Sequence, residues 1–426
     1  MTGDAIDALR ERLAAQGVHT LVAQFTDLHG VAKGKLLPLA QLRTLVETGA
    51  GFSGPSIAGT GLPRMGPRSE YYGRGDLASA CALPWLPGHA RLVCDGFVAG
   101  VPFDACPRQV LRRQVARLAE RGWTLHTGIE PEFFLLRRTE RGYAPADDHD
   151  RLAKPSYDLK SLPRQAGFLH ELATALAACG LEVLQADHED AQGQYEVNFL
   201  HADALASADR LMLFKQAAHA LAERRGMVFS MMPKPFADQP GSGMHFHVSL
   251  EGCGDEAVPW HFIGGVLAHS AGLAALAAPT VNSYKRLVVG ESLSGTSWAP
   301  AFVAHGPNNR TALVRTLPGR FEWRLPDASA NPYLATAGLI AAGLDGIARR
   351  SDPGPACHDD LFEQPSAARL PRSLGEAVDA LEADATLCEA LGATLAREFI
   401  AAKRAEWTAY ARHVGDWELR RYAELF

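Results

Sequence analysis

The chain has 426 residues, of which 47% are hydrophobic and 21% charged, and its formal net charge is -6. This amount of apolar material suffices for a large folded interior and excludes disordered and collagen-like proteins. Acidic and basic residues are interspersed without long single-sign runs, which argues against a nucleic acid or an anionic membrane as the partner. We therefore expect a small-molecule partner.

The seven cysteines are scattered, odd in number and without a CxxC motif, so neither a disulfide framework nor a cysteine zinc site is indicated. The first residues lack the basic region and apolar run of a signal peptide. No apolar stretch reaches the roughly 20 residues that a membrane helix needs. These features together predict a cytoplasmic protein.

The first hundred residues predict a small α+β unit. Residues 4–16 have a helical pattern, residues 18–25 and a segment ending at residue 37 have strand patterns, and residues 27–30 form a turn between them. Residues 49–75 are rich in Gly, Pro and Ser, which predicts an irregular surface segment. The pattern of residues along the sequence changes near Pro102, so we expect one domain over residues 1–102 and a second over residues 103–426.

Strands and helices alternate in the second domain, after a helix over 107–122 that has a proline in its first turn. The predicted strands cover residues 128–137, 181–187, 194–200, 227–232, 244–250, 311–316 and 320–325. The predicted helices cover residues 164–179, 203–225 and 259–276, and the chain after residue 332 is mostly helical. The expected fold class is α+β.

Several predicted strands carry ionisable side chains two residues apart, which places both on the same face, about 7 Å from each other. A single carboxylate pair could belong to a solvated strand face, and a single buried histidine is usually a hydrogen-bonded core residue. Four strands with ionisable side chains on one face are hard to explain as core. The pairs on one strand are Glu130 with Glu132, His245 with His247, and Glu322 with Arg324. Glu189 and Glu196 flank a turn at residues 191–193, so a hairpin could bring these two together.

If these strand faces line one cavity, they bring five carboxylates together, and their repulsion must be relieved by protons or by cations. Carboxylates with a single imidazole form oxygen-rich sites that suit Mg²⁺ or Mn²⁺ better than zinc or copper. Such ions usually accompany phosphate. The sequence therefore predicts a divalent metal site.

Phosphate binding has its own candidates, because five arginines lie within 39 residues. A run of surface arginines is the alternative interpretation. Their alternation with strand residues favours guanidinium groups that point into the cavity, where they would pair with phosphate or carboxylate. Residues 30–36 imitate a Walker loop but have the wrong spacing and lack its Ser/Thr. The five are Arg286, Arg310, Arg315, Arg320 and Arg324.

The order of short motifs along most of the chain resembles the glutamine synthetase family. Near the start stands Phe-Thr-Asp at 25–27, and near the end Asn-Pro-Tyr-Leu at 331–334. Each motif is short, but the combination is highly specific. The others lie at residues 128–132, 187–196, 234–235, 241–247, 282–286, 309–311 and 322–327.

The resemblance implies an N-terminal β-grasp domain and a catalytic domain whose antiparallel strands form an open funnel surrounded by helices. It implies a homo-oligomer, a dodecamer of two hexameric rings in which neighbouring subunits share each active site. It also implies two or three Mg²⁺ or Mn²⁺ ions per site, one on Glu132, Glu189 and Glu196 and another on Glu130, His245 and Glu322.

The substrates that the resemblance implies are ATP, glutamate, and ammonia or a small amine. ATP converts the γ-carboxylate of glutamate to a γ-glutamyl phosphate, and the amine then displaces phosphate. The implied ATP-binding residues are His247, Ser249, Arg315 and Arg320. The implied substrate-binding residues are Tyr157, Gly241, Arg286 and Arg324, and the implied catalytic residues are Asp27, Glu291 and Arg310, with Asp27 donated by the adjacent subunit.

Departures from the family pattern bear on the substrate. Pro240 stands where an Asn is usual, which removes an amide and a backbone N–H and leaves open whether glutamate is the acid. The flap at residues 288–298 and the preceding motif at residues 282–286 resemble the branch that makes γ-glutamyl amides of small alkylamines, although the register of Glu291 in the flap is ambiguous. Phe362 occupies the position of the tyrosine that adenylylated bacterial enzymes modify.

Three functions remain open at this point. The first is a glutamate–amine ligase that favours a small alkylamine, and the second is an ordinary glutamine synthetase that uses ammonia. The third is a non-catalytic ring-forming regulator, which the presence of all six expected metal ligands disfavours.

Overall fold

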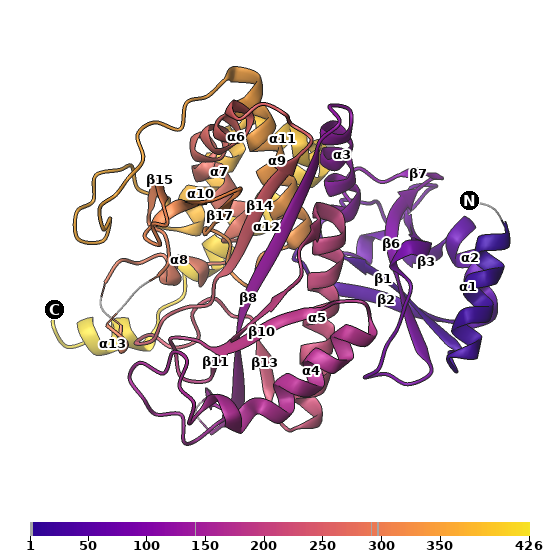
Figure 1. Cartoon of the computed structure of the whole chain (residues 1–426), viewed down its shortest axis with the longest axis horizontal. Helices are drawn as coiled ribbons and strands as arrows, with labels where there is room; N and C mark the ends of the chain where they lie inside the picture. The colour runs from indigo at the N-terminus through magenta and orange to yellow at the C-terminus, as the bar shows by residue number, and fades with distance from the viewer. Residues whose placement is uncertain (1–2, 141, 291, 296–297) are drawn as a thin grey trace.

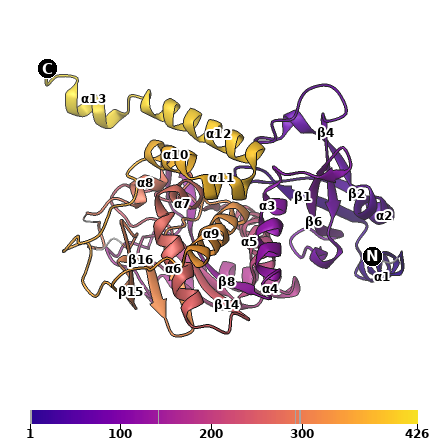
Figure 2. The same ribbon diagram turned by 90° about the horizontal axis from the view of Figure 1, so that it is seen from above.

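The computed structural model describes residues 3–140, 142–290, 292–295 and 298–426, and two sheets organise it. In Figure 1 the smaller sheet lies at the right, toward the N-terminus, and the larger one lies at the left among most of the helices. Figure 2, seen from above, places α12 (Ala393–Ala411) and α13 (Asp416–Tyr422) along one side of the body, with the C-terminus at its far end.

The smaller sheet has the order β2-β1-β6-β4-β3, with β5 and β7 also paired to β6. Helices α1 (Gly3–Ala15) and α2 (Leu42–Glu47) accompany it. The strands are β1 (Thr20–Thr26), β2 (Ala32–Pro38), β3 (Ala50–Ser53), β4 (Glu70–Gly75), β5 (Cys81–Ala82), β6 (His89–Val98) and β7 (Val101–Pro102). Short 3-10 turns lie at Leu39–Gln41, Gly54–Ser56 and Leu77–Ser79.

The prediction of an irregular segment over residues 49–75 was wrong at both ends, because β3 and β4 pair there as antiparallel strands with Phe52 opposite Tyr71. The Phe25 ring on β1 lies 4.9 Å from that of Phe52 and 5.0 Å from that of Tyr71. This aromatic contact with a strand distant in sequence stabilises the pair despite its glycines.

The larger sheet has the order β10-β11-β8-β14-β17-β16-β15, with β9, β12 and β13 paired to β8. These pairings are antiparallel except that of β15 with β16, which is parallel. The strands are β8 (Thr124–Thr139), β9 (Gly142–Pro145), β10 (Val183–His188), β11 (Gln194–Phe199), β12 (Ala202–Asp203), β13 (Val228–Ser230), β14 (Met244–Glu251), β15 (Phe302–Pro307), β16 (Ala312–Leu317) and β17 (Arg320–Trp323).

The predicted helices agree with the structure except in one place. The predicted helix over 259–276 is two helices bent by 77° at His269, whose ring is held between Asp345 (3.0 Å) and Asp384 (2.6 Å). The mostly helical end is confirmed, and its one long stretch without a helix covers residues 350–373. The remaining helices are α3 (Pro107–Ala119), a 3-10 turn at Leu162–Gln165, α4 (Ala166–Ala178), α5 (Ala204–Arg224), α6 (Ala257–Ala268), α7 (Ser270–Ala277), α8 (Ser283–Arg286), α9 (Pro332–Arg349), α10 (Leu374–Ala383) and α11 (Ala385–Leu391).

A buried arginine joins the smaller sheet to the helices beside the larger one. The Arg108 guanidinium on α3 is 3% exposed and contacts Asp95 of β6 at 2.8 Å, Asp76 at 2.9 Å and Asp209 of α5 at 2.7 Å. Tyr333 of α9 donates its hydroxyl to Asp209 at 2.7 Å. A charge this deeply buried is tolerated because several carboxylates surround it, and the network fixes the smaller sheet against α3, α5 and α9.

Within the described ranges, no single helix has the length and apolar character needed to cross a membrane; the bent pair α6 and α7 meets that test only when its two helices are taken together.

Candidate active site

The predicted functional side chains form a row across the middle of the larger sheet. The hairpin predicted for Glu189 and Glu196 is confirmed, because β10 and β11 pair around the turn at Gly193, whose φ is 73°. In register, Asp187 lies opposite Glu196 and Glu196 opposite Glu132. Further along the row His245 lies opposite Glu130, His247 opposite Glu322, and Glu322 opposite Arg315.

The first part of the row is an acidic cluster formed by Glu132, Glu189 and Glu196. One carboxylate oxygen from each lies within 4.8 Å of the others. Glu132 is fixed by the backbone N–H of Gly243 at 2.8 Å and by the side-chain amide of Gln194 at 3.0 Å. The three carboxylates that we expected to share one ion are thus within reach of a common cation.

The loop before β14 approaches the acidic cluster so closely that it requires glycine. A Cβ atom on Gly243 would lie 2.7 Å from Nε2 of His245 and 2.9 Å from a carboxylate oxygen of Glu132. A Cβ atom on Gly241 would lie 2.4 Å from the carbonyl oxygen of Pro233. The Gly-Ser-Gly sequence is therefore a steric requirement of the site.

The acidic cluster carries more negative charge than its surroundings neutralise. Burial raises the pKa of Glu132 to about 6, although Arg286 opposes the shift. Burial, and then the charge of Glu132, raise the pKa of Glu189 well above its ordinary value, and burial followed by Glu189 does the same to the pKa of Glu196. Each carboxylate makes its neighbours harder to ionise. A bound divalent cation would relieve this repulsion between negative charges.

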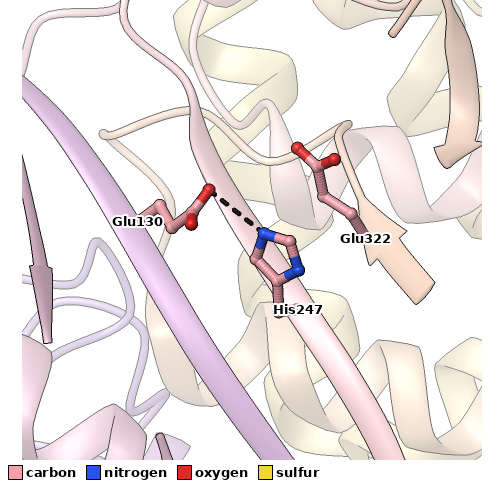
Figure 3. A group of neighbouring side chains, drawn as sticks. All are labelled: Glu130, His247 and Glu322. Carbon is pink, nitrogen blue, oxygen red and sulfur yellow. Dashed lines mark ion pairs between the residues drawn. The ribbon is translucent and has the colours of Figure 1, made fainter. Parts of the chain in front are cut away.

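A second group of metal-ligating residues lies around Glu130. Its carboxylate is 3.2 Å from Nε2 of His247, as Figure 3 shows, and Glu322 approaches the same imidazole. Glu130 also forms a compact group with Glu196 and His245. Nδ1 of His245 lies 3.4 Å from Glu322. The three residues expected to share the second ion are adjacent, with His247 as an additional candidate in that place.

Glu322 differs from the acidic cluster because arginines neutralise it. Arg315 contacts one of its oxygens at 2.8 Å, and Arg324 binds the other. Burial opposes ionisation, but Arg324 and then Arg315 bring the pKa of Glu322 below its ordinary value. Burial, followed by the charge of Arg324, lowers the pKa of His245 well below 6.5, so this imidazole is neutral and able to act as a metal ligand.

Most of the predicted residues line one cavity of about 1250 Å³. Arg286 is buried there and donates to the carbonyl oxygen of Leu325 at 3.0 Å. Arg320 donates to Nδ1 of His247 at 3.0 Å. The lining includes Glu130, Glu132, Tyr157, Glu189, Glu196, Gly241, His245, His247, Arg286, Arg310, Arg315, Arg320, Glu322 and Arg324, together with Pro240.

Two predicted residues are described outside this cavity. Ser249 is on β14 opposite His126 and is not among the described residues that line the cavity. Asp27 is 4% exposed; its side chain accepts from the backbone N–H groups of His29 and Val31 at 3.0 Å, and it does not reach the cavity of its own chain. Glu291 lies outside the described residues.

The structure adds residues to the cavity that the strand pattern missed, and three ionisable ones are examples. Asp187 lines it, and burial together with Glu130 raises the pKa of Asp187 to about 6. Asp190 and Lys234 also line it. Asp187 could have been found, because it stands two residues before Glu189 and faces Glu196 across the hairpin; Asp190 and Lys234 lie outside strands, where the period of two gives no signal.

The donor set fits hard divalent cations. It consists mainly of carboxylates, and the burial and mutual repulsion of Glu132, Glu189 and Glu196 demand positive charge that the described side chains around that cluster do not fully supply. Arg315 and Arg324 lie beyond Glu130 along the row, next to Glu322. Cations and guanidinium groups at the two ends of one cavity suit a polyphosphate.

Comparisons with known proteins agree with this geometry. Residues 104–422 match the family model for the catalytic domain of glutamine synthetase. The glutamate–methylamine ligase of Methyloversatilis universalis is 44% identical, over 96% of this chain and 97% of that protein. A glutamine synthetase of Rhizobium meliloti is 35% identical, over 98% of each. A solved structure of a GmaS/ADP complex covers 98% of this chain and 99% of its own, with a TM-score of 0.91 and 39% identity. The chain belongs to the glutamine synthetase family.

Proposed function

We propose that the protein is an ATP-dependent carbon–nitrogen ligase that joins a small primary amine to the γ-carboxylate of glutamate, with a γ-glutamyl phosphate as the intermediate. The observation that carries the proposal is the single row of side chains in which the buried Glu132, Glu189 and Glu196 cluster is followed by Glu322 and its arginines. The 44% identity with a glutamate–methylamine ligase supports the choice of an alkylamine.

The residues of the row have separate tasks in this reaction. Divalent cations, when bound, supply Lewis-acid neutralisation of the phosphate oxygens. Glu132, Glu189 and Glu196 hold one cation, and Glu130, His245 and Glu322 hold another. Arg315 and Arg320 bind the ATP phosphates beside His247, and Arg310 stabilises charge on the transferring phosphoryl group. Arg286, Arg324, Gly241 and Tyr157 bind and orient glutamate.

The attacking amine must lose a proton before it is nucleophilic, and Asp27 is the proposed acceptor. The Asn331 side chain donates to the Asp27 carbonyl oxygen at 3.0 Å, which anchors the Asp27 turn to its own catalytic half, away from its own cavity. Asp27 would then serve the cavity of a neighbouring subunit. This supports a ring-shaped homo-oligomer, which we propose to be a dodecamer of two hexameric rings.

The finer architecture belongs to the same proposal. Residues 1–102 would be a β-grasp domain, and residues 103–426 a catalytic domain of the glutamine synthetase type. The seven cysteines are unpaired, in keeping with the reducing cytoplasm. Phe362 has no hydroxyl, so the chain would escape adenylylation at this position.

The test is an assay of amide formation with glutamate, ATP and Mg²⁺ or Mn²⁺ over a series of amines, with the product identified by mass spectrometry. We expect methylamine, at equal concentrations of free amine, to give a higher kcat/KM than ammonia. A tenfold advantage for ammonia, about 1.4 kcal/mol in transition-state binding, would favour the second candidate, an ordinary glutamine synthetase, which 35% identity with such an enzyme also supports.

The assembly is tested separately by mass photometry of the active protein. A particle of twelve chains is the expected result. An active monomer would contradict the shared site, because Asp27 could not then reach any cavity.

A further inference from the structure

Asp190 accepts hydrogen bonds from three side chains on two segments of the chain. The residue is 3% exposed. One carboxylate oxygen accepts from the Ser156 hydroxyl at 2.5 Å. The other accepts from the Ser294 hydroxyl at 2.8 Å and from the indole Nε1–H of Trp298 at 3.2 Å. Three donors satisfy both oxygens of this buried carboxylate, which makes it a fixed point between the two segments.

Trp298 is held from two sides. Its ring donates to Asp190, while its carbonyl oxygen accepts from the Arg324 guanidinium at 3.1 Å. Arg324 is itself buried against Glu322. An indole N–H can only donate, so the Trp298 ring needs an acceptor, and the Asp190 carboxylate supplies it.

The segment that carries Ser294 and Trp298 has little regular structure to hold it. In the described part of the chain between α8, which ends at Arg286, and β15, which begins at Phe302, no helix or strand is present. Besides the contacts with Asp190 and Arg324, the backbone N–H of Leu293 donates to the carbonyl oxygen of Asp238 at 2.6 Å. Side-chain contacts therefore carry much of its attachment.

The third donor to Asp190 belongs to a second segment of the cavity wall. Ser156 precedes Tyr157, which lines the cavity, has a φ of 61° and donates its backbone N–H to the carbonyl oxygen of His188 at 3.0 Å. Asp190 thus joins the Tyr157 loop to the Trp298 segment in this wall.

We propose that Asp190 is a positioning residue that holds Ser294 and Trp298 against the Tyr157 loop and thereby closes the cavity around the small amine. Its consequence for the reaction rests on the proposed function. In a closed cavity the amine nitrogen attacks the γ-carbonyl carbon of the acyl phosphate and phosphate leaves. In an open one the oxygen of water attacks the same carbon, and glutamate and phosphate are released without amide.

Two substitutions disrupt the hydrogen bond between Asp190 and Trp298, one at the acceptor and one at the donor. Asp190→Asn keeps the shape of the side chain but replaces one acceptor oxygen with an N–H₂ group. Trp298→Phe keeps an aromatic ring and removes the N–H donor. The matched control is Trp260→Phe, because Trp260 is 46% exposed on α6 and is not among the described lining residues of the cavity.

The first measurement is independent of catalysis. Hydrogen–deuterium exchange of peptides that contain Ser294 or Trp298, followed by mass spectrometry, should become at least about fivefold faster in Asp190→Asn and in Trp298→Phe, since local opening governs exchange. Trp260→Phe should match the unmodified protein. The double variant should exchange no faster than the faster single variant, because both changes break one contact. Unchanged exchange in both single variants, or additive effects, would overturn the proposal.

The second measurement is the ratio of phosphate released to amide formed. We expect it to be near one in the unmodified protein and to at least double, with a raised KM for methylamine, in both single variants, while the KM for ATP stays within about twofold. Faster exchange with an unchanged ratio would refute the role in retaining the amine. If the unmodified protein formed no amide while exchange still rose, the proposed function would fail and the positioning role of Asp190 would stand.

Discussion

The two ends of the ionisable row solve the problem of buried charge in opposite ways. At one end, Glu132, Glu189 and Glu196 crowd together, and burial with mutual repulsion raises their pKa values. At the other end, Arg315 and Arg324 neutralise Glu322 and hold its pKa below the ordinary value. The difference teaches that carboxylates of one kind, on strands of one sheet, can differ in counter-charge: the acidic cluster depends mainly on bound cations, whereas Glu322, a proposed ligand of the second cation, is already paired with guanidinium groups of its own chain.

The largest expected effect on activity comes from removing a carboxylate of the acidic cluster at the first end of the row. Glu132→Gln keeps the size of the side chain but removes a charged ligand, so amide formation should fall by about 1,000-fold or more, within the range that one preorganised electrostatic group supplies. Initial rates at saturating Mn²⁺ measure this. The control is Glu251→Gln, since Glu251 is 75% exposed and pairs only with His126 in the described contacts. Full activity of Glu132→Gln would remove Glu132 from the metal site.

Breaking the second end should destabilise the fold. Glu322→Gln leaves the Arg315 and Arg324 guanidinium groups without their buried counter-charge, and the unfolding free energy of the metal-free protein should fall by about 3 kcal/mol or more. Urea titration in the presence of a chelator measures this. Glu132→Gln should have the opposite sign under the same conditions, because it relieves repulsion; a loss of stability in both variants would end the contrast between the two ends.

The pH dependence of stability should differ between the two ends of the row, and this effect is expected to be smaller. Glu132 has a pKa of about 6 in the folded protein and about 4.3 when unfolded. The folded state therefore binds more protons between these values, and its stability falls as pH rises through them, by about 2 kcal/mol for this group. Glu322, with its lowered pKa, gives stability that is present at higher pH and lost as pH falls.

The measurement compares the unmodified protein with Glu132→Gln at pH 4.5 and 7.5 in a chelator. The unmodified protein should lose more stability over this interval than the variant, and Mn²⁺ at pH 7.5 should restore it. Equal losses of stability in the two proteins would show that burial does not raise the pKa of Glu132.

The period of two along strands explains why so much of the site could be predicted from sequence. Glu130 with Glu132 and His245 with His247 leave one strand face whatever the neighbours are, so this central part of the row required only that β8 and β14 pair. Which imidazole contacts which carboxylate could not be predicted, because His245 and His247 share that face. His245 lies opposite Glu130 in register but contacts Glu322, and His247 lies opposite Glu322 but contacts Glu130.

Other features depend on contacts far apart in sequence and left no local signal. β3 and β4 are held by Phe25 from another strand. The bend at His269 accompanies its contacts with Asp345 and Asp384, 76 and 115 residues further along the chain. Asp190 has its role only because Ser294 and Trp298, more than a hundred positions later, return to it.

The Arg108 network has a consequence for how the molecule comes apart. One guanidinium is shared by Asp76 and Asp95 beside the first sheet and by Asp209 on α5, so separating the halves would strand a buried charge on each side. Local openings that release one half alone are therefore suppressed, and the two sheets melt as one cooperative unit. A protease that cuts between Pro102 and Pro107 would leave two fragments that stay bound to each other until the whole chain unfolds.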